Sequence, residues 1–344
     1  LNGFQQGLTV SVAALLFVLL CAFVGQAVAV YVGHRVRSRV TWRPARLVDA
    51  LSGSALSVAA MLLIAWVLGV AASGAQLSGL NQEVRNSVVL GEVDRVLPGN
   101  SGTLLSTFSS IVDSSQFPRY LEPFTPELIR AVPAPPKAVA RRPGVQRAAQ
   151  SVVKILGAAE SCSRSLEGSG FVYRPGRVMT NAHVVAGVPN PIVRIDDTDY
   201  RARVVYYDPE IDVAVLDVPG LPAPALRFGG TRDSGDPAAV LGYPEDGPFN
   251  VQPARIRDEQ TLRSPDIYGN GTVYRDTYSI YSLVREGNSG GPLVSPSGQV
   301  IGVVFAASLT NSRTGYALTS KQVQHAASAG SRSTARVGTG GCAS

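Results

Sequence analysis

Ser289 is the residue of this sequence whose surroundings best suit covalent chemistry. It lies in a glycine-lined run from Glu286 to Pro292, and a strand-like stretch from Val300 to Phe305 follows. A tight turn of this kind exposes a hydroxyl and gathers the backbone N–H groups of Gly287, Asn288 and Ser289 where an oxyanion can sit. The pattern indicates acyl transfer, although glycines beside a serine also form ordinary β-turns.

A serine nucleophile needs a base, and the chain contains three histidines. His34 lies in a basic segment between two apolar stretches, and His325 lies in a predicted C-terminal helix beyond the last strand. His183 remains, just after a predicted strand at 168–172 and a turn at 175–176. We therefore predict that His183 is the base, with a buried structural histidine as the alternative interpretation.

The third member of such a site is an acid that fixes the tautomer of the imidazole and stabilises the imidazolium. Asp212 opens a short apolar strand after a turn, so its carboxylate is expected where a loop meets the core. Asp208 and Asp217 remain alternatives. Three further acids have the pattern of a hairpin turn: Asp196, Asp197 and Asp199.

The order His183, Asp212, Ser289 and the residues around them resemble the trypsin-like, chymotrypsin-fold peptidases, particularly the bacterial branch that includes the HtrA enzymes. The resemblance covers roughly residues 148–325. It implies an all-β fold of two barrels, with the histidine and the aspartate from the first barrel and the serine from the second. It also implies a serine endopeptidase that forms an acyl-enzyme and acts on polypeptides without a cofactor or a metal.

Two further expectations follow from this resemblance. Counting back from the nucleophile places Leu283 at the base of the primary specificity pocket, with Ala306 and Ala307 on a wall, so an apolar or aromatic side chain is expected before the cleaved bond. The HtrA enzymes carry PDZ domains after the protease, whereas only about twenty-five residues follow the last motif strand here. Activation by that route is not expected.

The first 73 residues have the composition of a membrane segment. Two apolar stretches, about 8–32 and 47–72, each exceed the roughly 20 residues needed to cross a bilayer. A signal peptide is the alternative for the first, but its apolar stretch is too long and the basic cluster follows it. The short loop between the stretches holds five arginines (Arg35, Arg37, Arg39, Arg43 and Arg46). Such loops stay cytoplasmic, which places everything after residue 73 outside.

Residues 74–145 are predicted to connect the membrane to the protease domain at 146–344. An apolar pattern at 76–97 suits an amphipathic helix near the membrane surface. The stretch 98–145 is rich in proline and is predicted to be an extended tether that proteases can nick, the chain's own protease domain included. Because the chain starts at Leu1, further residues are expected before it.

The three cysteines differ in their setting. Cys21 lies in the first apolar stretch and is expected to be a small apolar residue. Cys162 and Cys342 flank the protease domain on the predicted outer side, where disulfides persist. We predict that they pair, with two free thiols as the alternative.

The membrane part is similar to colicin V production (CvpA-type) proteins, and the whole combination resembles the mycobacterial acid-resistance periplasmic proteases. This implies an inner-membrane, multi-pass protein with an extracytoplasmic protease that serves envelope or acid-stress resistance. Envelope proteins, peptidoglycan-processing enzymes among them, are the implied substrates. A membrane transport or secretion component with a protease-fold sensor is the alternative. The net charge of +6 lies largely in the arginine loop, so no nucleic-acid partner is expected.

Overall fold

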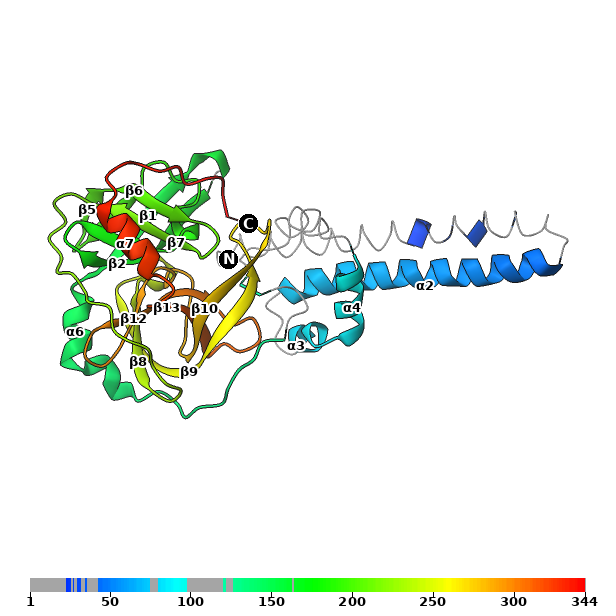
Figure 1. The fold of residues 1–344 in the computed structure, drawn as a ribbon, viewed down its shortest axis with the longest axis horizontal. Helices are drawn as coiled ribbons and strands as arrows, with labels where there is room; N and C mark the ends of the chain where they lie inside the picture. Colours follow the sequence, from blue (N-terminus) through cyan, green and yellow to red (C-terminus); the bar gives the residue numbers. More distant parts are fainter. Residues whose placement is uncertain are drawn as a thin grey trace. The chain divides into compact units, whose positions relative to one another are not determined.

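The computed structural model describes residues 23–25, 27, 30–31, 35, 43–74, 80–97, 120–121, 126–162 and 164–343. The chain divides into two compact units, Leu1–Ser114 and Ser115–Ser344. Figure 1 shows helices in the first unit and mainly strands in the second. Most of the first predicted membrane span, together with Cys21 and His34, lies outside the described residues.

The first unit contains α2 (Arg43–Gly74), α3 (Leu80–Arg85) and α4 (Val88–Val96). Within α2, Leu51–Val70 has a mean hydropathy of 2.1, and its 20 residues span about 30 Å. Among the described residues this is the one helix long and apolar enough to cross a membrane. It coincides with the second predicted span.

The segment after α2 differs from the single amphipathic helix predicted at 76–97. It forms two short helices, and the break lies at Ser87, whose hydroxyl accepts a hydrogen bond from the backbone N–H of Leu90 at 3.4 Å. A serine in extended conformation with such a bond starts a new helix. Within the unit, α4 is held to α2 because Trp66 Nε1 donates to Asp94 Oδ1 at 2.9 Å.

The second unit begins its β structure with a seven-stranded antiparallel sheet in the order β5-β4-β1-β2-β3-β7-β6. Its turns follow from their residues: Pro175–Gly176 joins β2 to β3 with Gly176 at φ +68°, and Asp196–Asp197 joins β4 to β5 with both residues at positive φ. The strands are β1 (Val152–Ala159), β2 (Arg164–Arg174), β3 (Arg177–Thr180), β4 (Ile192–Ile195), β5 (Thr198–Arg201), β6 (Arg203–Asp208) and β7 (Val213–Asp217).

The remaining six strands close a barrel in the order β10-β13-β12-β11-β8-β9. They are β8 (Pro237–Gly242), β9 (Asn250–Pro265), β10 (Thr272–Tyr281), β11 (Pro292–Val294), β12 (Val300–Ala307) and β13 (Thr314–Thr319). Each half has its own apolar core, and a third cluster that includes Phe171 and Phe305 joins residues of both halves. The predicted all-β fold in two barrel-like halves, preceded by an apolar helix, is confirmed, although the first half is an open sheet.

Helices flank the strands on both sides in the sequence: η1 (Lys137–Arg141) and α6 (Pro143–Ala149) precede them, and α7 (Gln324–Arg332) follows them. The prediction of an extended tether up to residue 145 is wrong for its later part. Tyr120, Val139 and Val145 are buried, and Pro143 starts α6 at a position where proline needs no N–H partner. The prolines keep the chain extended locally, but apolar and polar side chains between them dock on the β structure.

Candidate active site

Ser289 lies in the turn between β10 and β11, and glycines shape that turn. Gly287 and Gly290 have φ of +83° and +80°. A Cβ at Gly290 would lie 2.2 Å from the carbonyl oxygen of Ser169 and 3.0 Å from the backbone nitrogen of Asn181. The turn therefore needs glycine for two reasons, its left-handed backbone and its close approach to the first sheet.

The peptide between Glu286 and Gly287 is held in one orientation. The carbonyl of Glu286 accepts from the backbone N–H of Glu245 at 2.8 Å. In a trans peptide the C=O and the N–H point in opposite directions, so this bond turns the N–H of Gly287 away from Glu245. Within the described part of the chain, the backbone N–H groups of Gly287 and Ser289 donate to no protein acceptor. Two donors are thus available for an oxyanion.

Asn288 differs from the sequence prediction, which included it in the oxyanion hole. Its backbone N–H donates to the carbonyl of Arg285 at 3.0 Å, and its side-chain Oδ1 accepts from the Arg285 N–H at 3.0 Å. Both bonds close the turn that precedes the serine. Asn288 therefore stabilises the turn, and its backbone N–H, which already donates to Arg285, is not available to bind an oxyanion.

His183 and Asp212 form a buried pair in the first half. Asp212 Oδ2 lies 2.7 Å from His183 Nδ1, and Oδ1 accepts from the backbone N–H of His183 at 2.9 Å. Asp212 has φ +62°, a conformation that aspartate tolerates, and Asn181 Nδ2 donates to its carbonyl at 2.7 Å. With Nδ1 bound to the carboxylate, the imidazole presents Nε2 as its free nitrogen.

The rival acids have other partners. Asp208 accepts from the backbone N–H groups of Glu210 and Ile211, which is the bonding of a turn. Asp217 forms ion pairs with Arg177 and Arg203. Of the three candidates, Asp212 is the one that the structure places against His183.

The serine turn packs on the segment that leads to His183. The N–H of Ser169 donates to the carbonyl of Ser289 at 2.8 Å. A Cβ added to Gly168 would lie between the side chain of Val184 and the carbonyl oxygen of Ser289, so the two segments are in close contact there. Among the described residues, Ser289 Oγ has no hydrogen bond to His183. Such bonds are often long in enzymes without substrate and tighten in the complex.

Tyr207 is close enough to Asp212 to interact with its charge. Its hydroxyl is 2.7 Å from that of Tyr268, and burial, aided by Tyr268 and by the charge of Asp212, raises the pKa of Tyr207 above its usual range. Tyr207 thus stays neutral beside the carboxylate. Within the described ranges, no group of three or more His, Cys, Asp or Glu is placed to hold a metal ion.

The predicted pocket residues are apolar but differ in exposure. Leu283 is 37% exposed, while its neighbour Val284 is buried against Gly315. Ala306 is buried and Ala307 is partly exposed at the end of β12. No charged side chain stands at these predicted positions.

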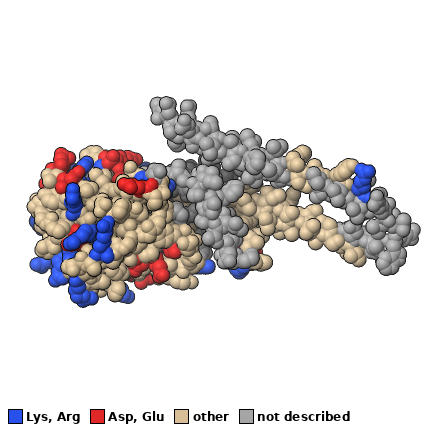
Figure 2. Space-filling model, turned by 90° about the horizontal axis from the view of Figure 1, so that it is seen from above, with Lys and Arg blue, Asp and Glu red and all other residues tan. Residues whose placement is uncertain are grey.

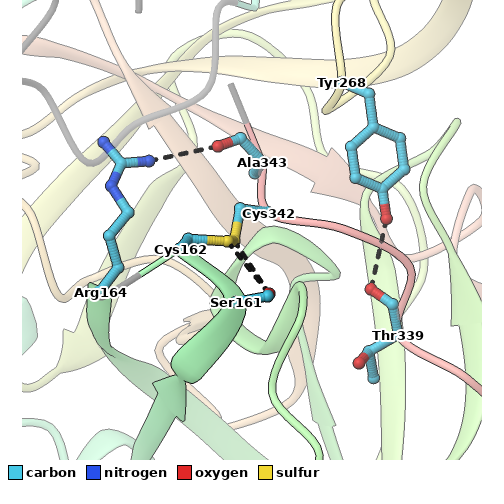
Figure 3. The surroundings of a disulfide bond; sticks show 7 residues. All are labelled: Ser161, Cys162, Arg164, Tyr268, Thr339, Cys342 and Ala343. Carbon is cyan, nitrogen blue, oxygen red and sulfur yellow. Dashed lines mark hydrogen bonds between the residues drawn. A yellow bond between two sulfur atoms is a disulfide. The ribbon is translucent and has the colours of Figure 1, made fainter.

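Cys162 and Cys342 form a disulfide with a Cα–Cα distance of 6.4 Å (Figure 3). Figure 3 also shows Arg164 donating to the carbonyl of Ala343 at 3.3 Å. Nearby, the N–H of Gly187 donates to the carbonyl of Thr339 at 3.0 Å, shortly after the turn that holds His183. The C-terminal tail therefore runs beside the loop that follows the histidine.

Ser169 has a role that the sequence prediction missed. Its hydroxyl donates to the carbonyl of Gly287 at 2.6 Å and accepts from the N–H of Tyr243 at 2.8 Å, so it links the serine turn to the loop beside it. The signal available in the sequence was a polar residue between two glycines, Gly168-Ser169-Gly170, directly before the apolar residues Phe171 and Val172. A buried hydroxyl in that setting needs partners.

Comparisons with known proteins agree with this geometry. Residues 168–303 match the family model of the trypsin-like peptidase domain, and residues 2–98 match that of colicin V production protein. The fold and these matches define the chain as a trypsin-like serine protease with an N-terminal helix apolar enough to span a membrane.

A more particular relationship is also clear. The chain is 42% identical to the serine protease Rv3671c (MarP) of Mycobacterium tuberculosis H37Rv over 316 residues, which are 91% of this chain and 79% of the relative. The crystal structure of that protease in its active form covers 65% of this chain and 99% of its own, with 46% identity and a TM-score of 0.62. This chain belongs to the same serine protease family, so the expected relationship is confirmed.

A second relative is more distant. A probable periplasmic serine endoprotease, DegP-like, of Halomonas elongata is 36% identical over 149 residues, which are 41% of this chain and 29% of that protein. The match covers less than half of either protein and agrees with a serine protease of HtrA or trypsin-like type.

Proposed function

We propose that this chain is a membrane-tethered serine endopeptidase in which Ser289, His183 and Asp212 form the catalytic triad. The supporting observation is the buried pair of His183 and Asp212, with its 2.7 Å and 2.9 Å contacts, next to a glycine turn that carries the serine. This pairing fixes the tautomer that a base needs.

The chemistry follows from these groups. Ser289 Oγ attacks the carbonyl carbon of a peptide bond while His183 Nε2 takes its proton, and Asp212 stabilises the imidazolium. The N–H groups of Gly287 and Ser289 bind the tetrahedral oxyanion. His183 then gives the proton to the leaving amine, and water repeats the sequence on the acyl-enzyme.

The location is part of the proposal. The five arginines from Arg35 to Arg46, the last two of which lie in the first turn of α2, favour a cytoplasmic position for that segment, which places the protease unit outside the cytoplasm. Substrates are then envelope proteins, with peptidoglycan-processing enzymes among them, and the role is resistance to acid or envelope stress. The proline-rich stretch before residue 120 is a candidate site for cleavage by the same domain.

A second candidate rests on the colicin V production match over residues 2–98. In that case the membrane helices act in transport or secretion, and the protease unit is their sensor. Such a protein would keep its fold without turning over peptides.

The test is labelling of the full chain in membranes by an active-site serine phosphonate. Wild type and Ser297→Ala, an exposed serine on a neighbouring turn, are expected to be labelled, and Ser289→Ala is expected to remain unlabelled. A wild-type protein that neither reacts nor cleaves peptides would favour the sensor.

Substrate preference is tested by sequencing the products of a peptide library. Because Leu283, Ala306 and Ala307 are uncharged, we expect apolar or aromatic residues before the cleaved bond. Cleavage restricted to sites after Arg or Lys contradicts this preference.

A further inference from the structure

The carboxylate of Glu127, in the segment before the first strand, is held by five hydrogen-bond donors of the protease unit. Oε1 accepts from the hydroxyls of Tyr120 at 2.6 Å and Tyr316 at 2.7 Å. Oε2 accepts from Ser308 Oγ at 2.8 Å, from the N–H of Thr310 at 3.3 Å and from Thr310 Oγ1. An ionised carboxylate has about four lone-pair sites, so two of the three donors to Oε2 share one of them.

Tyr120 completes this cluster. Its ring lies 4.8 Å from that of Tyr316, and its hydroxyl accepts from the N–H of Leu309 at 2.8 Å. Burial, followed by the charge of Glu127, raises the pKa of Tyr120 well above its usual range, so the hydroxyl remains a donor. The segment before the protease strands is thus bonded to each residue from Ser308 to Thr310.

The residues 308–310 continue the strand that contacts the nucleophile turn. In β12, the carbonyl of Val304 accepts from the N–H of Gly290 at 2.8 Å, and its own N–H donates to Gly291 at 2.9 Å. From Val304 to Ser308 the extended chain covers about 13 Å. Ala306 and Ala307, the predicted pocket wall, lie between these two points.

The other end of the same loop is held in a similar way. Arg257 donates through Nη1 to the carbonyl of Arg130 at 2.7 Å and through Nη2 to that of Arg313 at 3.4 Å. The carbonyl of Arg313 also accepts from the N–H of Ser282, the residue before Leu283, at 3.2 Å. The segment around Glu127 therefore contacts the β12 end of the β12–β13 loop directly and is linked to its other end through Arg257, which connects it to both predicted sides of the pocket.

We propose that Glu127 is a positioning residue for substrate binding: from outside the β structure, it fixes the β12–β13 loop and with it the strand end that substrate residues before the cleaved bond contact. This inference rests on the proposed function of the site. Glu127 touches neither the substrate nor the reacting atoms. The segment from Tyr120 to Arg130 is then a working part of the protease and cannot be removed with the membrane anchor.

The test compares Glu127→Gln in the full chain with Glu259→Gln, the same change at an exposed carboxylate on β9. Two peptides are used, one with four residues before the cleaved bond and one with a single residue there. We expect Glu127→Gln to raise KM for the long peptide about tenfold. The amide NH2 group of glutamine would face hydrogen-bond donors of the protease unit in place of a carboxylate oxygen, so the end of β12 is expected to shift. The KM for the short peptide, kcat for both peptides and all values for Glu259→Gln are expected to stay within about twofold.

Two results would overturn the inference: an unchanged KM for the long peptide, or an equal loss on both peptides that tracks a loss of folded protein. If Glu127→Gln does not fold, Thr310→Val, which removes one donor from the loop side, is measured instead, and an unchanged KM there also overturns it. Failure of the proposed function is separate, since wild type would then remain unlabelled by the phosphonate.

Discussion

At the scale of single residues, the site depends on groups that hold peptide bonds in one orientation. Gly287 is the clearest case, because the carbonyl before it is bound by Glu245 and its own carbonyl by Ser169. The direction of its N–H is therefore fixed before any substrate arrives. Preorganised donors of this kind contribute to catalysis without reorganisation.

Replacing Gly287 by alanine tests this orientation. The new Cβ would lie 2.3 Å from the carbonyl oxygen of Tyr243 at a φ of +83°, so the turn must shift and the oxyanion donor moves with it. We expect kcat to fall by about a hundredfold or more. Gly271→Ala, where a Cβ meets nothing within 4 Å, is the control. A Gly287→Ala enzyme with normal kcat would show that this N–H is not used.

The choice among the three acids has its own test. Asp212→Asn leaves the residue in place but no longer fixes the tautomer of His183, and we expect a loss in kcat on the order of 10⁴. Asp208→Asn alters the hydrogen bonds of a turn, and Asp217→Asn weakens the ion pairs with Arg177 and Arg203. For both variants kcat is expected to stay within about tenfold of wild type. Peptide hydrolysis by the three purified variants decides, and a similar loss in all three contradicts the assignment of Asp212.

The residues that the sequence could predict are those whose neighbours in the chain carry the signal. Ser289, His183 and Asp212 each lie in a local run of glycine or apolar residues, so their candidacy was visible without a structure. Glu127 and Ser169 were not, because their side chains are bonded mainly by groups at sequence separations of 74 to 189, Tyr120 beside Glu127 excepted. Composition reports local preference, whereas contacts at such separations depend on the fold.

At the scale of elements, the same limit explains the wrong prediction for the tether. Proline is unfavourable in the interior of a helix and in a central strand, so the stretch was interpreted as an extended, solvated tether. In the structure, α6 contacts the turn before β12 so closely that a Cβ on Gly144 would lie 2.3 Å from the backbone of Ser297, and a Cβ on Gly298 would lie 2.3 Å from the carbonyl oxygen of Gly144. Two glycines far apart in sequence thus allow one backbone to pack on another.

This contact predicts that Gly144→Ala destabilises the protease unit. The added methyl group meets backbone, which cannot rotate away, so a loss of about 1–3 kcal/mol in the free energy of unfolding is expected. Urea unfolding followed by pulse proteolysis measures it. Gly230→Ala, which places its Cβ in open space, should remain near the wild-type value. Equal midpoints for the two variants would mean that α6 is free to move.

At the scale of the whole molecule, the surface charge and the disulfide both bear on where the protease unit works. Figure 2 shows basic and acidic side chains together on one face of the protease unit, so that face is not covered by charges of a single sign. The disulfide closes a loop with a sequence separation of 180 and ties the tail to the first sheet. Such a bond persists in an oxidising compartment and would be reduced in the cytoplasm.

We therefore predict that the disulfide between Cys162 and Cys342 stabilises the protease unit as a whole. Closing a loop of this length restricts the unfolded state, and the entropic model gives a stabilisation of up to about 5 kcal/mol. We expect Cys342→Ser to lower the urea midpoint of the protease unit, and reduction of wild type to lower it equally, because both open the same loop. Cys21→Ser, which changes the cysteine of the predicted membrane span, should leave that midpoint unchanged. A Cys342→Ser protein with the wild-type midpoint would mean that the tail is held by its other contacts, such as the bond from the N–H of Gly187 to Thr339, and that the disulfide adds little to them.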